Sequence, residues 1–337
     1  MRAIKIIISV TILPLLLVAF LLLSEWRPQD VEREVYAVEI VDLPDTLTLV
    51  SWNIGYAGLG EGMDFFYDGG ERTRGPREEG AENLRAIIAQ LSDLSYADFI
   101  LLQEVDFDSK RSYYVDQYEV ITEALDYNYS AKAYNYNSVF VPIPLCDPMG
   151  GVRSGVVTLS RYPLAESVRW QYPTIVGLPN RLFDLKRCML SAAVATPNGN
   201  FWVNNTHNTA FDSGDMRLRE VAFMGEIVES QGSFVVAGDW NSTPPGYTPS
   251  REAMENRYFS PHPLDIDELP QGVSVHFTPT VESVRYLDSP YEEGESVTTI
   301  VDFTILSSNC RIIRCETLDL KFENSDHNPI IITFLRE

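Results

Sequence analysis

A short stretch around residue 239 carries side chains suited to phosphate chemistry. Residues 234–237 are apolar and predict a buried strand, which runs into the sequence Gly-Asp-Trp-Asn at 238–241. In an extended chain Asp239 and Asn241 point to the same face, so a carboxylate and an amide would project together from the strand end. Such a pair suits a metal-bound phosphate and its attacking water. An Asx-rich turn explains the stretch equally well, so the motif needs support from elsewhere in the chain.

Similar polar residues lie at the ends of other predicted strands. Asn53, Glu104 and His207 each follow an apolar run, and Asp326 and His327 come just before the last one. The chain has only 4 histidines, so the placement of His207 and His327 at such junctions is informative. Each acid or histidine alone is most often structural, but the joint pattern favours a functional role for the set.

The composition disfavours duplex nucleic acid as a partner. The 337 residues include 26 Lys+Arg and 48 Asp+Glu, and the resulting net charge of −22 repels phosphates at long range. The 4 cysteines contain no CxxC pair, which argues against a zinc site, and they are too few for a disulfide framework. One disulfide, such as Cys146 with Cys188, stays open if the chain is exported.

The N-terminus is typical of a membrane anchor. Arg2 and Lys5 precede the uncharged segment 6–23, whose length is at the lower limit for spanning a bilayer. We therefore expect a transmembrane signal anchor within residues 1–23, with its basic end inside and the remainder outside the cytoplasmic membrane. Secretion after cleavage of a signal peptide is the alternative.

The rest of the chain divides into a linker, at residues 24–45, and one domain, at residues 46–337. Many strands with interspersed helices predict an α+β fold built from stacked layers. Asn198 and Gly199 predict a type I′ hairpin turn, whereas residues 127–136 fit no element clearly. Strands are predicted at 47–54, 98–104, 154–160, 190–196, 201–206, 234–237, 299–306, 311–316 and 329–334, and helices at 84–94, 115–125 and 216–228.

A long loop at residues 55–80 is rich in glycine, charge and aromatic residues. Loops of that length are usually functional or disordered. Its Arg72 and Arg74, together with Arg153 and Arg187 further along, are candidate phosphate-binding side chains, because guanidinium groups pair well with phosphate. A solvated, mobile loop is the alternative.

The short polar motifs, taken in order, resemble those of the endonuclease/exonuclease/phosphatase superfamily, whose fold is that of deoxyribonuclease I. The resemblance covers roughly residues 47 to 335 and implies a membrane-anchored, bacterial-type member with a four-layer αββα sandwich of two mixed β-sheets flanked by helices. The matching stretches are Ser51-Trp52-Asn53, Leu102-Gln103-Glu104-Val105, Ser154-Gly155, residues 159–164, Asn205-Thr206-His207, residues 238–241, Val301-Asp302-Phe303 and residues 325–329.

The resemblance also implies a role for each candidate residue. Glu104 would be the main metal ligand, helped by Asn53 and Asp326, and such an oxygen-rich set favours Mg²⁺, Mn²⁺ or Ca²⁺ over Zn²⁺. The catalytic side chains would position or deprotonate the water, bind the phosphate, and stabilise or protonate the leaving group. Whether Asp239 or His327 is the general base stays open. The implied catalytic set is His207, Asp239, Asn241, Asp302 and His327.

The resemblance implies a metal-dependent phosphoesterase, and the acidic balance and the expected anchor favour a lipid head group or a small organophosphate as its substrate. An extracytoplasmic nuclease of the same fold is the main alternative, and a non-catalytic binding domain is a weaker one. The expected partners are the phosphoester and, through the N-terminal helix, a membrane. The chain is expected to be a monomer.

Overall fold

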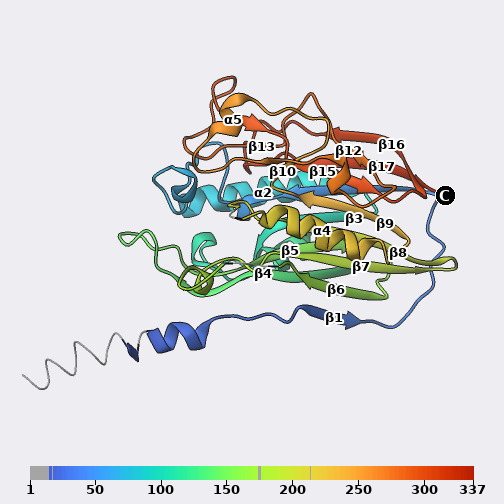
Figure 1. The fold of residues 1–337 in the computed structure, drawn as a ribbon, viewed down its shortest axis with the longest axis horizontal. Helices are drawn as coiled ribbons and strands as arrows, with labels where there is room; N and C mark the ends of the chain where they lie inside the picture. The colour runs from blue at the N-terminus through green and yellow to red at the C-terminus, as the bar shows by residue number, and fades with distance from the viewer. Residues whose placement is uncertain (1–14, 17, 174–175, 213) are drawn as a thin grey trace, which may run out of the picture.

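Two β-sheets stacked face to face form the centre of the computed structural model, which describes residues 15–16, 18–173, 176–212 and 214–337 (Figure 1). Their facing sides share one apolar core, which includes Leu49, Leu101, Leu190 and Val235. Burial of such side chains is the main driving force for stacking the sheets. The contacts between the sheets bring strand ends from distant parts of the chain to a common edge.

The first sheet has 6 strands in the order β16-β17-β2-β3-β5-β4. Its β2 and β3 are parallel, whereas the other neighbours are antiparallel, so the sheet is mixed. The strands are β2 (Thr46–Asn53), β3 (Phe99–Asp106), β4 (Tyr129–Val141), β5 (Gly150–Ser160), β16 (Cys310–Thr317) and β17 (Ile330–Arg336).

The second sheet has 7 strands in the order β1-β6-β7-β8-β9-β15-β12 and is also mixed, because β8 and β9 are parallel. Every residue of β7 is buried, since helices or the other sheet cover both of its faces. The strands are β1 (Val31–Val35), β6 (Glu166–Gln171), β7 (Cys188–Thr196), β8 (Gly199–His207), β9 (Ser233–Asp239), β12 (Ser274–His276) and β15 (Asp302–Leu306).

Helices cover the outer faces of both sheets. Leu84, Ile87 and Leu91 of α2 (Arg77–Asp93) recur at helical spacing and pack on the first sheet together with α3 (Gln117–Ala124). On the second sheet, α4 (Met216–Val228) buries apolar side chains such as Met224. The predicted α+β sandwich of two mixed sheets between helices is therefore confirmed.

Ten short elements complete the described chain, and six of them lie between residues 242 and 299. They are η1 (Gly55–Ala57), η2 (Phe66–Asp68), η3 (Lys110–Ser112), η4 (Asn180–Leu182), η5 (Ile266–Glu268), α5 (Arg251–Glu255), β10 (Ser242–Thr243), β11 (His262–Pro263), β13 (Val284–Arg285) and β14 (Thr298–Thr299).

Several local expectations need correction. Part of the expected linker is strand β1, which pairs with β6 at the edge of the second sheet. Residues 127–136, which fit no element, belong largely to β4. The hairpin turn is not type I′, because Pro197 and Asn198 occupy the turn and only Gly199 has a positive φ, of 110°.

The expected anchor falls mostly on residues 1–14 and 17, which lie outside the described residues. Within the described part, no helix is long and apolar enough to cross a membrane. The described cysteines Cys146, Cys188, Cys310 and Cys315 are all free, so the disulfide between Cys146 and Cys188 does not form here.

Candidate active site

The predicted site residues meet at one edge of the two sheets. In the second sheet, Asp239 on β9 lies opposite His207 on parallel β8 and opposite Asp302 on antiparallel β15. In the first sheet, Asn53 ends β2 and pairs with Gln103, the residue before Glu104. Asn53 then donates a hydrogen bond of 3.0 Å to Asp239, which joins the two sheets at this edge.

Glu104 reaches the site because its strand is irregular. The pairing of β3 with β5 shifts between Leu102 and Val105, as in a β-bulge, and Glu104 has a left-handed φ of 54°. Such a backbone costs of the order of 1–3 kcal/mol in a non-glycine residue and is often found at functional sites. The bulge leaves the Glu104 carboxylate partly exposed, 3.8 Å from His207 Nε2.

Asp239 is held by a tight approach of two strands. A Cβ atom on the preceding Gly238 would lie 2.0 Å from the carbonyl oxygen of Thr206, so only glycine fits there. The backbone N–H of Asn241 donates to Asp239, while the Asn241 side chain donates to the carbonyl of Asn208. Burial raises the pKa of Asp239, although the nearby His327 opposes that shift.

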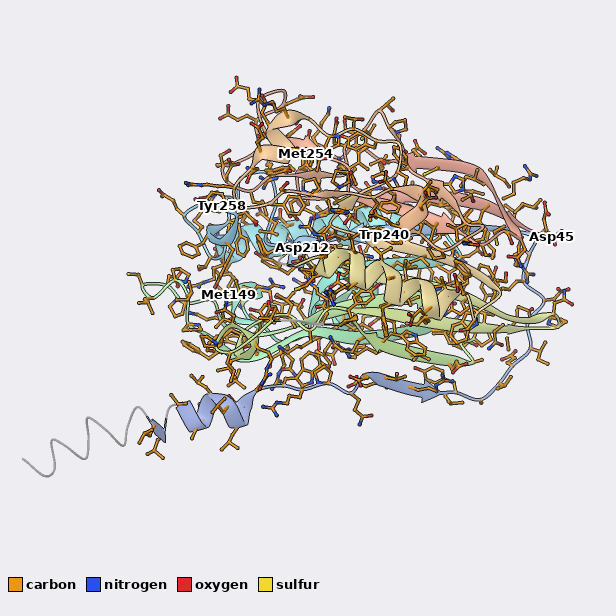
Figure 2. All side chains as sticks on the ribbon, viewed as in Figure 1. Asp45, Met149, Asp212, Trp240, Met254 and Tyr258 are labelled. Atoms are coloured by element: carbon orange, nitrogen blue, oxygen red, sulfur yellow. The ribbon has the colours of Figure 1, made fainter. Side chains whose placement is uncertain are left out.

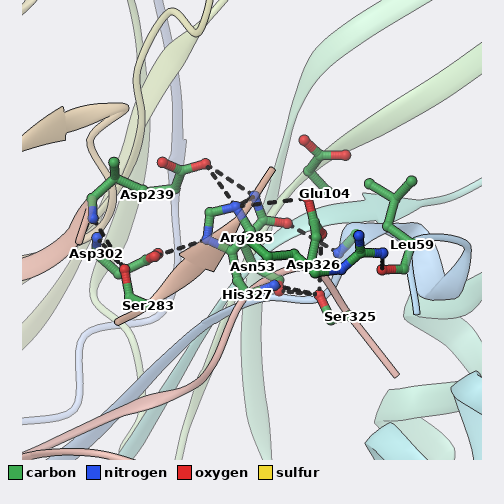
Figure 3. A network of polar contacts seen from close by, with 12 residues as sticks. Asn53, Leu59, Glu104, Asp239, Ser283, Arg285, Asp302, Ser325, Asp326 and His327 are labelled. Atoms are coloured by element: carbon green, nitrogen blue, oxygen red, sulfur yellow. Dashed lines mark hydrogen bonds and ion pairs between the residues drawn. The ribbon is translucent and has the colours of Figure 1, made fainter. Parts of the chain in front are cut away.

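His327 lies between two carboxylates, as Figure 3 shows. Its Nδ1 is 2.7 Å from Asp302 Oδ2, and its Nε2 is 3.8 Å from Asp239 Oδ2. Burial favours the neutral ring, but Asp302, Asp239 and Asp326 outweigh it and raise the pKa of His327 to about 10. The ring is therefore an imidazolium at neutral pH and donates a hydrogen bond to Asp302.

His207 has the opposite charge state to His327. It is fully buried, and its Nε2 contacts the guanidinium of Arg187, while Nδ1 is 3.1 Å from the Asn135 amide. Burial first, then the positive charges of Arg187 and His327, lower the pKa of His207 well below its ordinary value. His207 is therefore a neutral imidazole at neutral pH, and its Nε2 accepts from the Arg187 guanidinium.

Glu104 and Asp326 are two carboxylates close enough for their charges to interact. Burial, and then the charge of Glu104, help to raise the pKa of Asp326 to about 6, even though His327 acts against this. A divalent cation would relieve this repulsion between carboxylates. The side-chain oxygen of Asn53 accepts from the Gly55 N–H and keeps a second lone pair. These oxygen donors fit Mg²⁺, Mn²⁺ or Ca²⁺.

A second acid–histidine group has suitable spacing for a metal. Among the described residues, the donor atoms of Asp239, Asp302 and His327 lie within 4.8 Å of one another. In this group the Nδ1 of His327 is already hydrogen-bonded to Asp302.

The site opens into a pocket of about 410 Å³, whose walls are largely apolar and aromatic. The long loop 55–80 is folded and contributes Tyr56, Phe65 and Tyr67 to these walls. Asp68 of the same loop also lines the pocket, and burial, with the charges of Asp326 and Glu104, raises its pKa to about 7. Sequence patterns did not indicate Asp68, because nothing placed η2 beside the catalytic edge.

The predicted arginines separate into two groups. Arg187 lines the pocket. The others are not among its lining residues and have acidic partners: Arg72 pairs with Asp64, Arg74 with Asp147 and Arg153 with Asp108.

Arg111 is a pocket residue that sequence reasoning missed. It pairs with Asp106 at 2.9 Å, lies 3.9 Å from Glu104, and stacks over the ring of Tyr56. Its place in the short η3 turn carried no pattern that could have revealed it.

The chain belongs to the endonuclease/exonuclease/phosphatase family, whose model matches residues 50–327. Members of this superfamily are hydrolases that act on phosphoester bonds. No curated protein matches the chain.

Solved structures share the fold at low sequence identity. An endonuclease/exonuclease/phosphatase from Beutenbergia cavernae DSM 12333 has a TM-score of 0.62 and 17% identity over 86% of this chain and 72% of that one. ANGEL2, a 2',3'-cyclic phosphatase in complex with adenosine-2',3'-vanadate, has a TM-score of 0.55 and 16% identity, over 92% of this chain and 100% of that one. D. rerio TDP2 complexed with single-strand DNA product has a TM-score of 0.52 and 15% identity, over 86% of this chain and 98% of that one.

Proposed function

We propose that the protein is a metal-dependent phosphoesterase that hydrolyses a phosphodiester or phosphomonoester by in-line attack of water. The observation that carries the proposal is the convergence of Glu104, Asp239 and His327 on one pocket from separate strands and loops. Family membership supports phosphoester chemistry, and the oxygen donors support a divalent cation.

Glu104 and Asp326, with Asn53, would hold the cation, which we infer to be Mg²⁺, or Mn²⁺ or Ca²⁺ in its place. When bound, it supplies Lewis-acid stabilisation of charge on a phosphoryl oxygen. The protein's part is to fix these ligands, and the bulged backbone at Glu104 and the hydrogen bond from Gly55 to Asn53 do so.

The geometry favours Asp239 as the group that accepts the proton of water. His327 is tied to Asp302 and already protonated, so it stabilises negative charge instead of taking up a proton. Asn53 orients the Asp239 carboxylate from the opposite sheet. Arg187, which donates to neutral His207 beside Asp239, is placed to bind phosphate oxygens with its remaining N–H groups.

The pocket favours a substrate with an apolar part over a nucleic acid. Aromatic and aliphatic side chains dominate its lining, which suits a lipid phosphoester or a small organophosphate. A nuclease needs a basic track that follows the backbone. Three basic side chains outside the pocket have partners within the protein: Arg153 bonds Asp108, Arg161 bonds the Ala97 carbonyl, and Arg181 bonds Glu25.

A substrate panel tests the proposal. Full-length protein with Mg²⁺ or Mn²⁺ should hydrolyse bis-p-nitrophenyl phosphate, and sphingomyelin or phosphoinositides should be turned over faster than plasmid DNA. Preference for plasmid DNA would favour the nuclease alternative. Absence of turnover on every phosphoester would support a binding domain.

We also propose that the N-terminal segment holds the domain at the outer face of the cytoplasmic membrane. The support is the uncharged run at 6–23 after Arg2 and Lys5. A C-terminal reporter that is active only in the cytoplasm would contradict this topology.

A further inference from the structure

Several exposed apolar side chains line the pocket or lie within two residues of its lining in the sequence. Among the described residues, Leu145 in the loop between β4 and β5 is 81% exposed, although it is one of the most apolar residue types. Ile143 and Phe211 both line the pocket and are also exposed. We call this set the apolar rim, and it consists of Val139, Phe140, Ile143, Leu145, Leu178 and Phe211.

Large apolar side chains grouped at one site usually mark a surface that meets a partner. The partner must tolerate a chain with a net charge of −22 and must lie directly over the active-site mouth. A phospholipid bilayer meets both conditions, because apolar side chains can enter its headgroup region without needing positive charge on the protein.

The position of the N-terminal segment gives independent support for a bilayer. In Figure 1 the helical residues 18–24 leave the domain at the left-hand end, where the loop before Met149 also lies, as the label in Figure 2 shows. Asp45 and the C-terminus lie at the opposite end. The helical segment is itself apolar and exposed, with Val18, Phe20 and Leu23 among its side chains.

Specific contacts fix this exit point beside the mouth. Glu25 bonds Arg181 at 2.7 Å, and Arg181 belongs to η4, whose first residue Asn180 lines the pocket. The next residue, Trp26, lies with its ring under the guanidinium of Arg169. The apolar segment therefore leaves the domain beside the pocket lining at Asn180, and Met149, at the end of the loop that carries Ile143 and Leu145, lies toward the same end of the molecule (Figure 2).

We propose that the apolar rim docks on a phospholipid bilayer and holds the pocket mouth against the lipid headgroups. A lipid-borne phosphoester could then pass into the apolar pocket without crossing water. The claim about the substrate rests on the proposed phosphoesterase function, whereas the claim about docking does not.

A fluorophore on the native Cys146 tests docking directly. This cysteine is exposed and follows Leu145, whereas Cys188 and Cys310 are buried, and Cys315→Ala removes the remaining partly buried thiol. Full-length protein on phosphatidylcholine vesicles with doxyl-labelled lipid should show at least about twofold quenching at Cys146. Raising NaCl from about 0.1 to about 1 M should leave it unchanged, because apolar insertion is not screened by salt.

The matched control carries the fluorophore on an apolar position of similar exposure far from the mouth. Ile313 is 54% exposed on β16, at the opposite edge of its sheet from β4. The variant Ile313→Cys with Cys146→Ser should show no quenching. An unquenched fluorophore at Cys146, equal quenching at both positions, or loss of quenching in salt would overturn the docking proposal.

Charged substitutions on the rim separate docking from catalysis. Leu145→Glu and Phe140→Glu should each reduce quenching to the control level, while Ile313→Glu should not. Leu145→Glu and Phe140→Glu should also lower turnover of a vesicle-borne phosphoester at least about tenfold. Their turnover of water-soluble bis-p-nitrophenyl phosphate should equal that of the unaltered protein. Equal losses on both substrates would contradict docking, because the changes would then act on the site itself. If neither substrate is hydrolysed by the unaltered protein, the phosphoesterase proposal fails and quenching alone decides docking.

Discussion

His327 Nδ1 lies 2.7 Å from Asp302 Oδ2, and both side chains are buried at the edge where the two sheets meet. The carboxylate fixes the ring and keeps it charged, together with Asp239 and Asp326. The pair therefore presents a fixed positive charge toward Asp239.

Removing the charge of Asp302 should weaken catalysis more than binding. Asp302→Asn keeps the shape but favours a neutral His327, so kcat should fall about a hundredfold to ten-thousandfold with little change in KM. Steady-state kinetics on bis-p-nitrophenyl phosphate measures this. Asp319→Asn, an exposed acid paired with Lys321, is the control and should behave as wild type. A wild-type kcat for Asp302→Asn would remove the pair from the mechanism.

Arg187 and Arg153 should differ, although both were candidate phosphate binders. Arg187 lines the pocket beside His207, so Arg187→Ala should lower kcat/KM about 10- to 100-fold through loss of a charge-assisted hydrogen bond. Arg153 pairs with Asp108 on the surface, and Arg153→Ala should have no measurable effect. The reverse order in a kinetic comparison would mean that phosphate binds elsewhere.

Gly238 should be essential for the fold at the site. A Cβ there would overlap the Thr206 carbonyl at 2.0 Å, so Gly238→Ala should cost about 3 kcal/mol of unfolding free energy or more. Gly272 also has a positive φ, of 76°, but open space around it, so Gly272→Ala should cost only about 1–2 kcal/mol. Urea denaturation compares the two, and equal costs would show that the strand approach can relax.

Glu220 should make stability depend on pH. It is buried and accepts hydrogen bonds from the Thr209 backbone and hydroxyl next to the site. Burial raises its pKa from 4.5 to about 7, although the bonds from Thr209 oppose the shift. Between these values the folded state binds more protons than the unfolded state, so this group's contribution to stability falls as pH rises.

The size of this pH effect follows from the interval between the two pKa values of Glu220. As pH rises from 4.5 to about 7, the unfolding free energy should fall by roughly 1.4 kcal/mol per pH unit, which gives about 3 kcal/mol in total for Glu220. Glu220→Gln should abolish that share of the pH dependence in urea denaturation at pH 5 and pH 8. Glu255→Gln, at an exposed ion pair with Arg251, should leave the dependence unchanged. Parallel curves for wild type and Glu220→Gln would disprove the assignment.

Sequence reasoning succeeded where local pattern and strand ends carry the information. The strand before Asp239, the helix 216–228 and the polar residues beside each strand end could be predicted, because periodicity and short motifs are local. Strand β4 was missed because its burial does not alternate regularly, and β1 because its residues are mostly exposed and polar.

Properties that depend on distant neighbours could not be predicted. The opposite charge states of His207 and His327 come from burial, with Arg187 near the first and three carboxylates around the second. Similarly, Arg111 and Asp68 join the pocket only because η3 and η2 fold over it. Only Arg187 of the predicted arginines lines the pocket, since the other guanidinium groups find acidic partners nearby.

Metal dependence at Glu104 tests the central claim most directly. Turnover of bis-p-nitrophenyl phosphate is measured after complete chelation and again after addition of Mg²⁺, for wild type and for Glu104→Gln. We predict that chelation abolishes wild-type turnover, that Mg²⁺ restores it, and that Glu104→Gln stays at least about a hundredfold slower at the same Mg²⁺ concentration. Turnover that survives chelation, or a Glu104→Gln variant as fast as wild type, would contradict the account.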